Sequence, residues 1–149
     1  MKFTKHILSV STLALAVTGA PAFANNSSGA TASDPVYNTA TVMNVQGTVA
    51  SVQRVPAGNP LAGLHLTVNS EAGAFDVYVG PSDFLRFLRV RFRAGDRVEI
   101  IGSKVELENA DVILTREVNE GRAQLTLRDA NGVAAWESWA KEIDPADVE

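Results

Sequence analysis

The chain has 149 residues, of which 46% are hydrophobic and 20% charged, and its formal net charge at pH 7 is −4. It contains no cysteine, which excludes disulfide bonds, thiol nucleophiles, cysteine-ligated zinc and covalent haem attachment. An apolar core therefore has to stabilise the fold, and the length suits a single domain.

Residues 1–24 have the order of a cleavable secretory signal peptide. Two lysines precede an apolar run at residues 7–17, and the small residues Ala22 and Ala24 stand where a signal peptidase reads. The run is too short to cross a bilayer, which takes about 20 residues. We expect cleavage near Ala24, a periplasmic or secreted protein, and no transmembrane segment after cleavage.

Cleavage makes the protein more acidic. It removes Lys2 and Lys5 from the 13 basic residues and none of the 17 acidic ones, which leaves 11 against 17 and a net charge of −6. Nucleic-acid-binding proteins usually carry a basic surface. Nucleic-acid binding is therefore the least favoured function.

After a small, polar, flexible linker at residues 25–40, the pattern predicts an all-β domain over residues 41–136. Short runs that alternate apolar and polar residues are separated by turn residues, as in antiparallel strands. The predicted strands are 41–55, 63–68, 75–79, 97–105, 111–118 and 123–128. An acidic tail, 137–149, follows, and we expect Trp136 and Trp139 to cover an open end of the domain.

One helix is predicted between the third and fourth strands. It starts in the sequence Gly80-Pro81-Ser82-Asp83, because proline fits a first turn and an acid favours the positive helix end. One helix at this point in a small barrel is the order of the OB-fold. We therefore predict a small OB-fold-like antiparallel barrel of five to six strands. A plain meander or an SH3-like barrel is the alternative.

Several strings in this domain carry a resemblance to known proteins. They are 47–49 (GTV), 63–68 (GLHLTV), 76–81 (DVYVGP), 95–103 (GDRVEIIGS), 113–118 (ILTREV) and 125–129 (LTLRD). Together they resemble exported bacterial OB-fold domain proteins, and similar modules occur in periplasmic redox-associated and magnetosome-associated proteins. The resemblance covers roughly residues 42–136. It implies the fold and supplies no catalytic residues.

The second and third predicted strands place four polar or aromatic side chains on one face. If residues 69–74 connect the strands, position 65 pairs with 78 and position 67 with 76, and cross-strand partners share a face. The ligand-face candidates are therefore His65, Thr67, Asp76 and Tyr78, on the face with which OB-folds commonly bind ligands. The alternative is a structural histidine packed against Tyr78.

His65 is also a candidate metal ligand. It is the one histidine that remains after cleavage, and an imidazole beside Met43 or a carboxylate is a suitable metal ligand. Soft metals require several sulfur ligands, however, and the spacing of a calcium loop does not occur. A metal-binding periplasmic protein is thus an alternative function, and no metal ligand or cofactor is assigned.

The strongest local concentration of charge comprises five arginines within 12 residues. They are Arg86, Arg89, Arg91, Arg93 and Arg97. Val90 and Phe92 alternate with three of them, so an extended segment would gather the charges on one side. Guanidinium groups suit carboxylates and phosphates, which predicts an envelope protein or an anionic ligand as the partner. The alternative is a solvated helix end at which some of the arginines pair with Asp83, Asp96 or Glu99.

Enzyme signatures are missing from the sequence. There is no nucleophile motif and no glycine-rich phosphate loop, and one histidine without cysteine leaves few pairs of nucleophile and base. We predict a non-catalytic periplasmic binding or accessory module. Its oligomeric state stays open.

Overall fold

The computed structural model describes residues 35–142. The predicted signal peptide at 1–24, the linker up to residue 34 and residues 143–149 of the predicted tail lie outside the described residues. No helix within 35–142 is long and apolar enough to cross a membrane.

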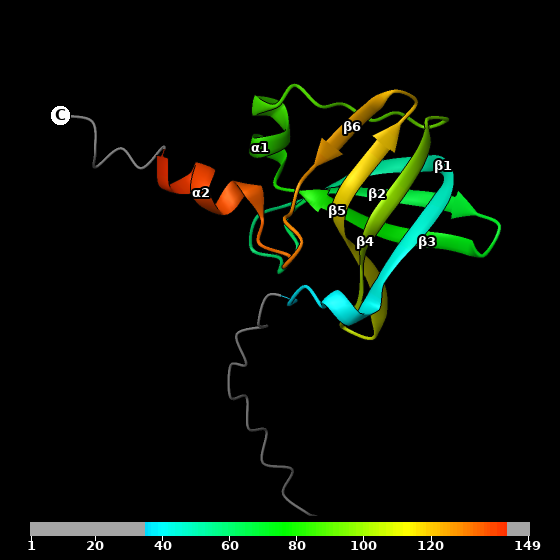
Figure 1. The fold of residues 1–149 in the computed structure, drawn as a ribbon, viewed down its shortest axis with the longest axis horizontal. Coiled ribbons are helices and arrows are strands. Elements are labelled where there is room, and N and C mark those ends of the chain that lie inside the picture. Colours follow the sequence, from blue (N-terminus) through cyan, green and yellow to red (C-terminus); the bar gives the residue numbers. More distant parts are fainter. Residues whose placement is uncertain (1–34, 143–149) are drawn as a thin grey trace, which may run out of the picture. The chain divides into compact units, whose positions relative to one another are not determined.

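Within residues 35–142 the chain forms six strands and two α-helices (Figure 1). The elements are the 3-10 helix η1 (Thr39–Thr41), β1 (Val42–Val55), β2 (Gly63–Ser70), β3 (Gly73–Gly80), α1 (Ser82–Phe87), β4 (Arg97–Leu107), β5 (Ala110–Glu120), β6 (Ala123–Thr126) and α2 (Ala135–Glu142). The six predicted strands and the helix between the third and fourth are confirmed. Helix α2 crosses residue 136, where the predicted domain meets the predicted tail.

The strands close into a ring. The C-terminal half of β1 pairs with β2 and its N-terminal half with β4, and β2–β3 and β4–β5 pair as well, all antiparallel. A parallel pairing of β3 with β5 completes the ring, from Asp76 opposite Val112 to Tyr78 opposite Leu114. β6 pairs with β5 beside the ring. The predicted all-β barrel is therefore confirmed, with one parallel contact that the residue pattern does not reveal.

Two glycines allow strands to approach closely inside this ring. A Cβ on Gly47 would lie 2.2 Å from the carbonyl oxygen of Asn69, and one on Gly102 would lie 2.4 Å from that of Leu114. Gly47 lies where β1 changes partner from β4 to β2. Any side chain at these positions would force neighbouring strands apart.

The interior of the barrel is filled mainly by branched side chains. Val77 and Val79 of β3 belong to this core, together with Leu66 of β2 and Ile100 of β4. Because successive strand residues point to opposite faces, Tyr78 lies on the other face of β3. There it packs in a second cluster with Leu61, Val112 and Leu114. Both faces of β3 are thus buried at this point.

The two tryptophans attach α2 to the rest of the domain. The ring of Trp136 lies 5.7 Å from Phe84 and 6.2 Å from Tyr78, and Trp139 lies 5.5 Å from Phe84. The guanidinium of Arg128 stacks 4.8 Å from the centre of the Trp136 ring, a favourable cation–π contact. The expected packing of the tryptophans against the domain is confirmed.

Candidate functional site

The predicted register of β2 and β3 is correct. His65 lies opposite Tyr78, and Thr67 lies opposite Asp76. The imidazole of His65 packs against the Tyr78 ring with 5.3 Å between centroids. The four ligand-face candidates therefore share one face of the sheet.

Other parts of the chain cover most of this face. His65 is only 8% exposed and Tyr78 only 6%, because Leu61, from the loop between β1 and β2, packs beside Tyr78. The hydroxyl of Ser51 donates to Thr67 Oγ1 at 3.0 Å. Asp76 is the exposed member of the four. The face offers a ligand little open surface.

Both ring nitrogens of His65 are engaged within the protein. Nε2 donates to the carbonyl oxygen of Leu61 at 2.8 Å, and Nδ1 donates to Oδ1 of Asp76 at 3.0 Å. Both partners are acceptors, and an imidazole that donates twice carries a positive charge. In its protonated form His65 can therefore make both bonds at once and hold the β1–β2 loop on β2 and β3.

The pKa of His65 agrees with this geometry. Burial by itself disfavours the charged imidazole, but the hydrogen bond to Asp76, the hydrogen bond to the Leu61 carbonyl and the attraction of the Asp76 charge outweigh it. The pKa of His65 is raised above its usual 6.5 as a result.

This arrangement does not favour the metal hypothesis. A metal ion needs a ring nitrogen with a free lone pair, so binding at His65 would break one of its two hydrogen bonds. Among residues 35–142, no group of three or more His, Cys, Asp and Glu is placed to hold an ion.

The predicted arginine segment lines an open groove of about 570 Å³. We call it the arginine groove, and its lining residues are Val52, Arg54, Leu64, Ser82, Leu85, Arg86, Arg89, Val90, Arg91, Phe92 and Arg93. They come from the end of β1, the start of β2, α1 and the segment between α1 and β4. Five are arginines and none is acidic, so the groove is strongly positive.

Four of these arginines form no ion pair within residues 35–142. Arg86 pairs with Asp83 on α1. In the described part of the chain, no ion pair joins an acid to any of the other groove arginines, which are Arg54, Arg89, Arg91 and Arg93. All four are exposed. The exposure of these side chains and the Arg86–Asp83 pair also agree with the alternative, a solvated helix end in which some arginines pair with acids.

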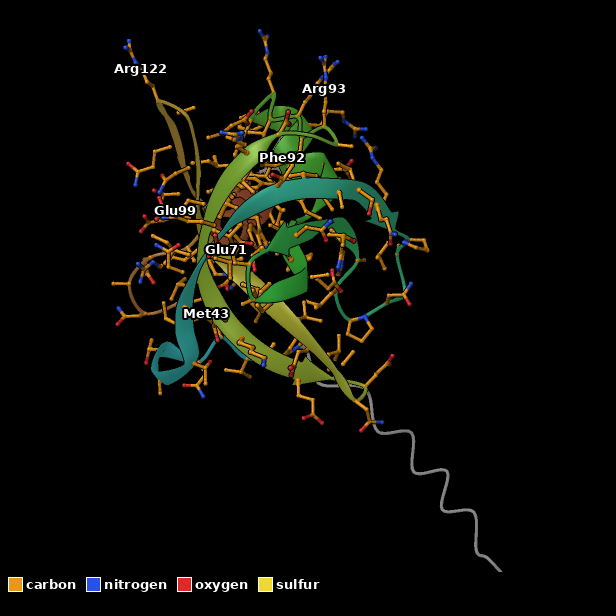
Figure 2. The ribbon with its side chains drawn as sticks, turned by 90° about the vertical axis from the view of Figure 1, so that its right-hand side faces the viewer. Met43, Glu71, Phe92, Arg93, Glu99 and Arg122 are labelled. Carbon is orange, nitrogen blue, oxygen red and sulfur yellow. The ribbon has the colours of Figure 1, made fainter. Side chains whose placement is uncertain are left out.

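The expected alternation in this segment is confirmed. Arg89, Arg91 and Arg93 are exposed, whereas Val90 and Phe92 are half-buried and pack against the core. Figure 2 shows Arg93 projecting away from the barrel and Phe92 lying closer to it. The groove thus combines a charged rim with an apolar floor.

Arg89 has an unusual backbone conformation. Its N–H donates to the Arg86 carbonyl and the Val90 N–H donates to the Leu85 carbonyl, which is the Schellman pattern that ends many helices. The left-handed residue of this motif is usually glycine, but here it is Arg89, with φ of 58°. A side chain in this conformation costs roughly 1 kcal/mol relative to glycine, and such strain gathers at functional sites.

The comparisons with known proteins now identify the family. Residues 41–125 match the model of the MamS/MamX magnetosome protein family. The chain belongs to this family. A search of curated proteins found no match. The MamS/MamX match includes the whole arginine groove and the four ligand-face candidates. It agrees with the resemblance to magnetosome-associated proteins.

The arginine groove of this MamS/MamX chain differs from the predicted patch at two positions. Arg97 lies in a separate hollow with Thr48, Glu99 and Asn119. Arg54, which was not predicted, joins the groove from the end of β1. Arg54 is distant in sequence from the other arginines, and only the pairing of β1 with β2 brings it to them, so no local signal marks it.

Proposed function

We propose that this MamS/MamX chain is an exported, non-catalytic OB-fold module that binds an anionic partner of the cell envelope through the arginine groove. The observation that carries the proposal is the set of four exposed arginines whose guanidinium groups form no ion pair within residues 35–142, above an apolar floor. Guanidinium groups bind carboxylates and phosphates with two parallel hydrogen bonds.

The order of the elements supports the OB-fold assignment. A five-strand ring in the order β1–β2–β3–β5–β4, with one helix between β3 and β4, suits this fold. Export rests on the predicted signal peptide at residues 1–24. A magnetosome family fits an accessory role in the envelope.

The chemistry of the groove supports a binding role in place of a catalytic one. General acid–base catalysis needs a side chain that exchanges a proton near neutral pH. The groove lining holds arginines, apolar residues and one hydroxyl, that of Ser82, and no imidazole or carboxylate. His65, the remaining candidate base, is engaged at both nitrogens.

Binding of defined polyanions tests the proposal. We expect the purified protein to bind a polyglutamate peptide or inorganic pyrophosphate, and the affinity to fall as salt rises, because exposed charges are screened. The double variant Arg91→Glu/Arg93→Glu should weaken binding by about tenfold or more, since two attractions become repulsions. Fluorescence anisotropy and calorimetry measure both affinities.

The matched control is Arg97→Glu/Arg122→Glu. It changes the net charge equally, but neither residue lines the groove, and Figure 2 shows Arg122 at a different corner from Arg93. We expect its affinity to stay within about twofold of the original. Equal losses in the two double variants, or no binding of either polyanion at low salt, would contradict the proposal.

A further inference from the structure

The arginine groove presents two chemistries to one ligand. Its floor includes Val52, which is 36% exposed, together with the more deeply buried Leu64 and Leu85. A purely ionic ligand would leave the apolar floor exposed to water. A purely apolar ligand would remove guanidinium groups from water without giving them a hydrogen-bond partner, which is costly. The favoured ligand therefore carries both acidic and apolar groups.

The order of exposed and half-buried side chains in the groove segment suits an extended ligand. Between α1 and β4 the chain belongs to neither a helix nor a strand, and its side chains alternate from exposed Arg89 to exposed Arg93. In an extended chain, side chains on one face repeat about every 6.6 Å. Arg89 ends α1 in a left-handed conformation, so this repeat applies to the ligand. Acidic side chains two residues apart in an extended ligand can face Arg91 and Arg93, while the residues between them face the floor.

The backbone strain at Arg89 also supports a ligand-binding role for the groove. A glycine there would end α1 without a steric penalty, yet the chain places a guanidinium at this position, on the groove. A side chain kept at an unfavourable backbone position indicates a use for that side chain.

We propose that the ligand of the arginine groove is an extended segment of a partner protein in which acidic residues alternate with apolar ones. This inference rests on the proposed function, anion binding at the groove, and adds the class of partner. It differs from anion binding in general because the order of residues in the ligand matters, as well as its charge.

Peptides of equal composition test this order. The first probe is an octapeptide that alternates Asp and Leu, and the second has the same residues with all Asp before all Leu. We expect the alternating peptide to bind about tenfold more tightly, because only it matches both the rim and the floor. Arg91→Glu/Arg93→Glu should lose this binding, and Arg97→Glu/Arg122→Glu should keep it.

The floor is tested separately with Val52→Thr, which keeps the shape of the side chain and replaces one methyl group with a hydroxyl. It should lower the ratio of the alternating-peptide affinity to the polyglutamate affinity several-fold. Circular dichroism shows whether the variant is folded. An unchanged ratio in the folded variant would mean that the floor takes no part, and the inference would be wrong.

The remaining outcomes separate this inference from the proposed function. Equal affinity for the two octapeptides, with polyglutamate still bound, overturns the inference and leaves anion binding in place. If neither octapeptide nor polyglutamate nor pyrophosphate binds, both fail. Tighter binding to phosphatidylglycerol vesicles than to the alternating peptide, lost in Arg91→Glu/Arg93→Glu, would assign the groove to a membrane surface and overturn the inference.

The acidic end of the chain itself is the last alternative occupant. Asp144, Asp147 and Glu149 alternate in part with apolar residues. We expect the variant Asp144→Asn/Asp147→Asn/Glu149→Gln to bind the alternating peptide with unchanged affinity. A several-fold gain in affinity would show that the chain's own end competes for the groove, which overturns the assignment to a partner protein.

Discussion

At the β2–β3 face the charged side chains bond to the protein itself, whereas in the arginine groove they are left to solvent. His65 is buried between the Leu61 carbonyl and Asp76, and its charge holds a loop in place. The guanidinium groups of Arg54, Arg89, Arg91 and Arg93 form no ion pair in the described domain. Both regions are rich in polar residues, but the imidazole of the first is bonded at both nitrogens, whereas four guanidinium groups of the second form no ion pair within residues 35–142.

This difference teaches that a cluster of functional side chains becomes a candidate site only if its donors and acceptors remain available. A buried polar group with all partners in place contributes to stability and is costly to disrupt. An exposed charge without partners contributes little to stability. The two regions should therefore respond in opposite ways to substitution.

The largest expected effect on stability is that of His65→Ala. The change leaves the Leu61 carbonyl without its donor and Asp76 without its counter-charge, and we expect the free energy of unfolding to fall by about 2 kcal/mol. Arg91→Ala should change it by less than about 0.5 kcal/mol, because Arg91 is exposed. Urea denaturation of both variants measures the difference. Similar losses would mean that the two regions do not differ in this way.

The change of the His65 contribution with pH should affect stability less than the loss of the His65 side chain. The pKa of His65 is raised in the folded state, so its contribution is fully present below the usual pKa of 6.5 and is lost as the pH rises through the folded-state pKa. Asp76→Asn removes the counter-charge. The stability difference between the original protein and this variant should be larger at pH 6 than at about pH 9.

Thermal unfolding across this pH range makes the measurement. Thr67→Ala, on the same face, serves as the control, because its side chain does not titrate. Its stability difference from the original protein should not change with pH. A difference for Asp76→Asn that is constant with pH would mean that His65 is neutral in the folded protein.

The smallest effect on stability is expected for Arg89→Gly, and it should be a gain where the other variants give a loss. Glycine removes the strain of the left-handed conformation at the end of α1, so stability should rise by about 0.5 kcal/mol, the gain being limited by the greater freedom of glycine in the unfolded chain. Binding of polyglutamate should weaken, because one groove guanidinium is lost. A variant that loses stability, or that binds as well as the original, would remove Arg89 from the argument for the groove.

The sequence by itself determined those features that depend on neighbours along the chain. The alternation of apolar and polar residues located six strands, and the proline and acid before Phe84 located α1. The register that places His65 opposite Tyr78 followed from one short connection. The predicted alternation of exposed arginines with half-buried Val90 and Phe92 was also confirmed. Each of these follows from the period of a strand or helix, which a local pattern records.

Tertiary structure alone decided which polar cluster remained open. Leu61 closes over His65 because the loop between β1 and β2 folds back on the sheet, and Arg54 reaches the groove because β1 ends beside β2. Arg97, adjacent in sequence to the groove segment, lies elsewhere because it starts β4. These contacts join distant residues through the ring of strands, and the hydrogen bonds that occupy or spare a side chain are formed only once that ring has closed.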